Sequence, residues 1–224
     1  MVQVTLAPAL ILRLQYALTA AAGALDVFCV TRLGGPFASV ITGNLVQVGS
    51  AVVDLDLRLA ARCAIAVAGF AVGVALGALV LRQAQPGWTG RTTLVTSAEF
   101  LLIVVVAAAW WASHGRPGVA GVDALLGLAA IAMGLQSAAT VTSGLPGAAT
   151  TYFTGTLTRA VRTIVTESQG LARGSRSALR LVALLAGAVA GGLTLQLAPL
   201  WAPALPALIV GTVAIVALIR LRTA

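Results

Sequence analysis

Long apolar runs alternate along the chain with short breaks rich in polar residues, glycine and proline, and this pattern predicts membrane helices. An α-helix needs about 20 mostly apolar residues to cross a bilayer. We identify eight helical segments, at residues 10–30, 37–53, 59–81, 92–111, 119–141, 148–165, 177–198 and 207–219. The pattern therefore predicts an all-α polytopic membrane protein that folds as a helix bundle.

Segments 37–53 and 148–165 are shorter and more polar than the others. Each follows a glycine–proline break, at residues 34–36 and 143–147. A broken or re-entrant helix is tolerated at membrane depth only where protein or water surrounds it. These two segments either cross or re-enter, so the pattern leaves open a range of six to eight spans.

Two halves of the chain share one order of landmarks, which predicts an internal repeat with halves at residues 1–116 and 117–224 of a single membrane domain. The aligned pairs are Gly23 with Gly134, Asp26 with Ser137, Gly43 with Gly155, Gly69 with Gly187 and Gly73 with Gly191. Each half then holds about four helical segments. Eight spans make the two halves parallel, whereas six spans make them inverted.

Composition agrees with a membrane class. Of the 224 residues, 59% are hydrophobic and 9% are charged, against about 25% charged in soluble proteins. The net charge is +8, and all basic residues are arginines that stand singly or in pairs between the apolar runs. This placement orients membrane helices and provides no basic face for nucleic acid.

The arginines also predict which side the termini face. Eight spans would place eleven arginines on one side and three on the other, and six spans would divide them ten to four. The side richer in arginine is cytoplasmic by the positive-inside rule. Both models therefore put the N- and C-termini in the cytoplasm.

Polar groups inside apolar runs are the candidate functional residues, because ionisable groups in a membrane are costly. The set for substrate binding or coupling is Asp26, Thr42, Gly43, Asn44, Glu99, Gln136, Thr154, Gly155, Thr156 and Arg159. Asp26 has two readings: it couples a proton or cation, or it pairs structurally with an arginine or a helix terminus. For the hydroxyl and amide groups, hydrogen bonding between helices is the alternative to ligand contact.

An enzyme is not expected. The chain has one histidine, which falls in a predicted loop, and it has neither a phosphate-binding loop nor a cluster of cysteine and histidine. We predict no catalytic residue, no metal and no cofactor. Trp110 and Trp111, at the end of segment 92–111, are expected to be anchors at the membrane interface.

The motifs resemble a known bacterial family. Gly23 and Asp26 are followed by Thr42-Gly43-Asn44-Leu45, and the second half carries Gly134, Gln136 and Ala138 and then Thr151-Tyr152-Phe153-Thr154-Gly155-Thr156. These elements resemble the YoaK-like membrane family, also called domain of unknown function 1275. Val27 and Ser137 depart from the alanine and asparagine usual in that family. The resemblance implies a multi-pass protein of the bacterial plasma (inner) membrane, with about six spans and no assigned function.

The paired, interrupted segments favour a small-solute transporter or permease, since such segments mark the site at the repeat interface of transporters. The expected partners are the lipid bilayer and a small polar solute or proton. The alternative is a membrane interaction or scaffold protein without transport. The sequence leaves the substrate, coupling ion, direction and any homo-oligomer open.

Overall fold

The structure is a computed structural model that describes residues 5–143, 153–166 and 170–223. In these ranges the chain forms eight α-helices and one short 3-10 helix. They are α1 (Pro8–Arg32), α2 (Ile41–Val53), α3 (Leu57–Leu81), α4 (Gly90–Ala112), α5 (Val119–Thr142), α6 (Phe153–Thr166), α7 (Gly170–Leu197), η1 (Pro199–Trp201) and α8 (Ala204–Arg222). The predicted all-α bundle is confirmed.

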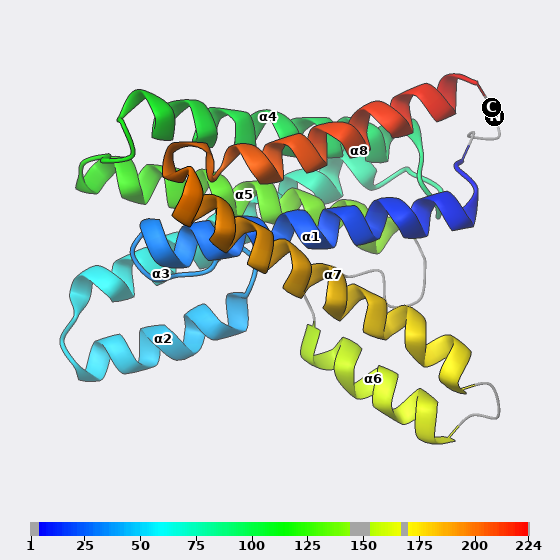
Figure 1. Cartoon of the computed structure of the whole chain (residues 1–224), viewed down its shortest axis with the longest axis horizontal. Coiled ribbons are helices and arrows are strands. Elements are labelled where there is room, and N and C mark those ends of the chain that lie inside the picture. The colour runs from blue at the N-terminus through cyan, green and yellow to red at the C-terminus, as the bar shows by residue number, and fades with distance from the viewer. Residues whose placement is uncertain (1–4, 144–152, 167–169, 224) are drawn as a thin grey trace.

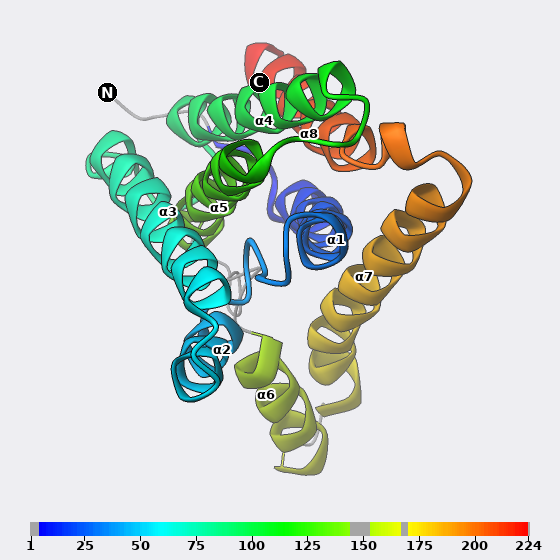
Figure 2. The same ribbon diagram turned by 90° about the vertical axis from the view of Figure 1, so that its left-hand side faces the viewer.

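The long helices lie side by side along one axis, and α1 begins at the end of the bundle where α8 finishes (Figure 1). Six of the described helices are long and apolar enough to cross a membrane. The view along the axis shows α1 in the interior, with α3 and α7 on opposite flanks (Figure 2). Burial agrees, since 67% of the span in α1 is buried, against 28% in α3 and 22% in α7.

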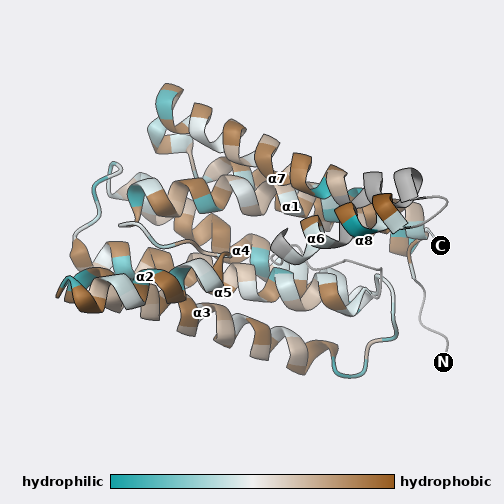
Figure 3. Ribbon diagram, turned by 90° about the horizontal axis from the view of Figure 1, so that it is seen from below, coloured by the Kyte–Doolittle hydropathy of each residue, from teal (hydrophilic) through white to brown (hydrophobic). Residues whose placement is uncertain are grey.

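Hydrophobic residues predominate along the long helices (Figure 3), and many large ones lie on the outside of the bundle. Large side chains such as Leu79, Leu101 and Leu185 are each at least 60% exposed. A water-soluble protein rarely exposes so much contiguous apolar surface, whereas lipid covers it at no cost. The chain is therefore a multi-pass integral membrane protein.

Helix α2 re-enters the bundle instead of crossing it. The chain leaves α1, turns at Gly34 and Gly35, whose φ angles are +89° and +108°, and runs back beside α1. Helix α2 then returns to the end from which the chain came, where α3 begins (Figure 1). Its 13 residues extend about 20 Å, which is too short for a hydrocarbon core of about 30 Å.

Helix α6 is the counterpart of α2 at the other end of the bundle. It begins near the middle of the long axis and runs toward the end where α7 starts (Figure 1). It has 14 residues. Six long helices and two short ones that begin near the middle agree with the re-entrant alternative.

Glycines let two helix pairs approach closely, and the two pairs are alike. α1 packs on α7, and α5 packs on α3. A Cβ on Gly187 would meet the backbone of Ala20, and a Cβ on Gly73 would meet the backbone of Ile131. On the partner helices, Gly23 lies against Leu184 and Ala188 of α7, whereas Gly134 lies against Phe70 and Val74 of α3.

These contacts correct the predicted register of the glycines. In the contacts that they make, Gly73 corresponds to Gly187, whereas the sequence had aligned Gly69 with Gly187. In the same way, Gly77 corresponds to Gly191. Gly77 lies against Leu135, and Gly191 lies against Ala24. Glycines repeat every four residues here, so an alignment of the sequence alone slips by one helical turn without losing a match.

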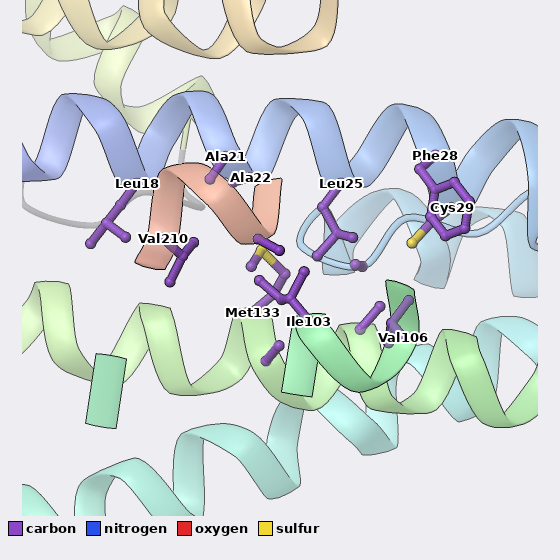
Figure 4. Close-up of a cluster of buried hydrophobic side chains, with 14 of the residues drawn as sticks. Leu18, Ala21, Ala22, Leu25, Phe28, Cys29, Ile103, Val106, Met133 and Val210 are labelled. Carbon is purple, nitrogen blue, oxygen red and sulfur yellow. The ribbon is translucent and has the colours of Figure 1, made fainter. Parts of the chain in front are cut away.

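The apolar core fills the space between α1, α4, α5 and α8. Leu18, Leu25, Ile103, Met133 and Val210 meet there (Figure 4) and are at most 1% exposed. Close packing of these side chains in defined rotamers makes this core rigid.

Trp110 extends this core, which contradicts its expected role as an interface anchor. Its ring lies 5.0 Å from that of Phe28 in an edge-to-face arrangement, and its indole Nε1 donates to the carbonyl oxygen of Pro199 at 3.0 Å. Trp111 is 59% exposed, as an interface residue would be.

Candidate functional site

Asp26 holds the loop that leads into α2. Its Oδ1 accepts hydrogen bonds from the backbone N–H groups of Ala38 and Ser39, both at 2.8 Å. Its Oδ2 accepts from the Ser39 hydroxyl at 2.5 Å. Three donors compensate the buried carboxylate, so in this conformation Asp26 has the structural partners that one of its two readings required.

The same carboxyl group lies close to the N-terminus of α2, because Ala38 and Ser39 stand two and three residues before Ile41. The residue before that helix, Val40, provides no side-chain cap. A helix N-terminus carries about half a positive charge, and Asp26 supplies the negative charge from α1. The backbone donors that precede α2 are thus satisfied by a side chain from another helix.

Asn44 braces the loop from the other side. Its Oδ1 accepts from the backbone N–H of Phe37 at 2.8 Å, and its Nδ2 donates to the carbonyl oxygen of Phe37 at 2.7 Å. Asn44 is fully buried. Thr42 is exposed and Gly43 is half-buried, so the Thr-Gly-Asn element turns its amide inward and its hydroxyl outward.

The residues that the predicted repeat pairs with these are only partly described. Thr156 is buried, and Gly155 is exposed, with no described atom within 4 Å of the place where a Cβ would lie. Gln136 is fully buried on α5. The side chains of Thr154 and Arg159 lie outside the described part of the structure.

A buried polar chain links α1, α7 and the residue that caps α5, near the end of the bundle where the termini lie. Gln15 of α1 donates from Nε2 to the Ser143 hydroxyl at 2.6 Å, and its Oε1 accepts from the Arg180 guanidinium at 3.0 Å. Arg180 is 4% exposed. It lies near the start of the predicted segment 177–198, and the structure places it within α7. It was not among the candidate functional residues.

Glu99 is different from every other described acid. It lies near the middle of α4 and is fully buried. Neither carboxyl oxygen has a hydrogen-bond partner in the described ranges. Asp26 lies on another helix, close to the C-terminal end of α1.

The two re-entrant helices bring the paired motifs into one region. The N-terminal ends of α2 and α6 lie close together near the middle of the long axis in two perpendicular views (Figures 1 and 2). α2 packs on α3, and α6 packs on α7. Asp26 and Asn44 hold the first of these two helices in place, while Glu99 lies apart, in the core.

Comparison with known proteins gives a family without an activity. No curated protein and no solved structure matches the chain. A family model described as "Protein of unknown function (DUF1275)" matches residues 14–216, which supports the resemblance seen in the paired motifs, although its description does not contain the YoaK-like name. Because this match covers most of the 224 residues, the chain belongs to the DUF1275 family.

Proposed function

We propose that this protein is a small-solute transporter or permease whose site lies between two inverted halves. The halves are residues 1–116 and 117–224. Each contributes a long helix, a re-entrant helix and two further long helices, in that order. Support comes from the shared glycine contacts of the pairs α1–α7 and α5–α3.

One observation carries the proposal: two short helices enter from opposite ends of the bundle and begin near its middle. Irregular backbone at membrane depth is retained only inside protein or beside water. In transporters, such discontinuous helices place their positive N-termini and free backbone groups around a solute at the midplane. A plain scaffold needs no interrupted helix, since straight spans satisfy their own backbone.

The proposed roles follow from position. Thr154 and Thr156, and Thr42 on the exposed face of α2, are proposed to supply hydroxyl groups near the starts of the two short helices. Gly43 and Gly155 are proposed to let a solute approach the backbone. Gln136 and Arg159 are proposed to contact polar or anionic groups of the solute. Asp26 and Asn44 are positioning residues that hold the α2 loop, through the hydrogen bonds described above.

The proposed location is the bacterial plasma membrane, with both termini in the cytoplasm. In the six-span arrangement, ten arginines fall on the side of the termini and four on the other. The positive-inside rule makes the arginine-rich side cytoplasmic. Arg58, Arg62 and Arg116 then face outward.

Solute flux tests the proposal. The purified protein is reconstituted in liposomes, and uptake of labelled amino acids, sugars, organic acids and inorganic ions is followed against protein-free liposomes. We expect one class to enter and Thr156→Val to reduce its rate. Thr212→Val is the matched control, because Thr212 is exposed on α8 and its hydroxyl donates only to the carbonyl oxygen of Leu208.

Two outcomes would contradict the proposal. One is that no solute class moves faster than in empty liposomes, which leaves the interaction or scaffold alternative. The other is that both threonine variants transport like the wild type, which places the site elsewhere.

A further inference from the structure

Glu99 occupies the inward face of α4. Thr92, Thr96, Glu99 and Ile103 follow at spacings of three or four residues, and all are buried. The Thr96 hydroxyl donates to the carbonyl oxygen of Thr92 at 3.1 Å, so it is engaged with its own helix. The carboxyl group of Glu99 therefore meets no hydrogen-bonding group within the described residues.

Glu99 lies one turn before Ile103 on the buried face of α4, which points into the core between α1, α4, α5 and α8. Ile103 of α4 and Met133 of α5 lie in the same core (Figure 4). Because α4 and α5 run in opposite directions, Glu99, one turn before Ile103, lies at about the level of Gln136, one turn after Met133. On α8, a Cβ added to Gly211 would lie 2.7 Å from the Phe100 ring. Glu99 is thus beside the contact between α4 of the first half and α8 of the second.

No described charge is placed to neutralise a carboxylate at this point. The ionisable side chains on the helices that contact α4 or share its core are Asp123 on α5, Arg220 and Arg222 on α8, Arg58, Arg62 and Cys63 on α3, and Arg13, Tyr16, Asp26, Cys29 and Arg32 on α1. Asp123 is bound to Arg62 at 2.8 Å and lies about 15 Å along α5 from Met133. Arg220 and Arg222 stand in the last turn of α8.

A buried carboxylate without a partner is strongly unfavourable, because it loses the hydration that water would give. A neutral carboxylic acid avoids most of that cost. Ionisable groups kept inside a membrane despite their cost mark ion and proton pathways. Asp26 shows the contrast, since three donors hold its carboxylate.

We propose that Glu99 is a proton-binding site, protonated while α4 and α8 are in contact and able to release its proton to water when that contact opens. Release breaks the O–H bond, leaves the carboxylate on Glu99 and gives the proton to water, and rebinding reverses the step. Since α4 and α8 belong to different halves, relative movement of the halves would expose the carboxyl group. Coupling of solute flux to protons rests on the proposed transport function, whereas proton binding itself does not.

Infrared spectroscopy of the protein in liposomes tests the binding. We expect a carbonyl stretching band of a carboxylic acid that Glu99→Gln removes completely and Asp26→Asn leaves unchanged. Asp26→Asn is the matched control because it changes the other acid buried in a described span. In the wild type, the band should shift in D2O and decline as the pH is raised, because the site opens transiently to water.

Three results would overturn proton binding at Glu99: no acid band is lost in Glu99→Gln, the loss occurs only in Asp26→Asn, or the wild-type band neither exchanges with D2O nor titrates below the pH of unfolding. The last result needs no variant, so a failure of Glu99→Gln to fold does not protect the proposal. That result would mean that Glu99 is a structural acid with no access to water.

Flux measurements separate this inference from the proposed function. With a solute that the wild type transports, Glu99→Gln should retain downhill flux and lose the acceleration by a proton gradient. Equal acceleration in the wild type and Glu99→Gln would refute coupling through Glu99. A wild type that transports nothing while its acid band exchanges and titrates would refute transport alone.

Discussion

The closest approach between helices gives the sharpest prediction, through the substitution Gly187→Ala. The added methyl group would fall on the backbone of Ala20 in α1. Backbone atoms in a helix cannot turn aside as a side chain can, so α1 and α7 must separate. Overpacking of this kind costs about 1–3 kcal/mol, and each 1.4 kcal/mol is about a tenfold change in the unfolding equilibrium.

The same substitution at Gly49 is the control, and its sign should be reversed. Gly49 is exposed on α2, with no described atom within 4 Å of an added Cβ. Replacing glycine by alanine inside a helix stabilises it by about 0.5–1 kcal/mol. Gly73→Ala provides a second test, because Gly73 meets the backbone of Ile131 as Gly187 meets that of Ala20, and we expect a loss similar to that of Gly187→Ala.

Unfolding of the purified protein in mixed micelles, followed by circular dichroism as the denaturing detergent is increased, measures these differences. The reasoning is refuted if Gly187→Ala is as stable as the wild type, or if Gly187→Ala and Gly49→Ala change stability in the same direction. A large loss for Gly187→Ala without one for Gly73→Ala would contradict the equivalence of the two helix pairs.

Two further substitutions test the loop and the core. Asn44→Ala removes both hydrogen bonds to Phe37 and leaves two backbone groups without partners, so we expect the protein to lose about 1–3 kcal/mol of stability. A cysteine introduced as Ser39→Cys should react faster with a thiol reagent when Asn44→Ala is also present. Unchanged labelling would contradict the bracing role of Asn44. Trp110→Phe retains a ring against Phe28 but removes the hydrogen bond to Pro199, so thermal unfolding should show a loss of stability of about 1 kcal/mol. For Trp110→Ala we expect a loss of about 3–5 kcal/mol. Equal losses would mean that the ring contact contributes nothing.

The sequence by itself determined the membrane class and the position of most helices. Segment 59–81 was predicted where α3 runs from Leu57 to Leu81, and segment 119–141 where α5 runs from Val119 to Thr142. These features are local, because apolar length sets the spans and glycine with proline sets the breaks. The sequence also marked Asp26, Asn44 and Glu99 as costly polar groups in apolar surroundings.

Tertiary structure alone decided what those groups contact. Asp26 bonds to residues 12 and 13 positions away, and Arg180 bonds to Gln15, which is 165 positions away. Such partners depend on which helices become neighbours, and apolar periodicity does not specify that. For the same reason the spacing of the glycines could not fix their register, and only packing separated the two acids: one held by three donors, the other enclosed without any in the described part of the chain.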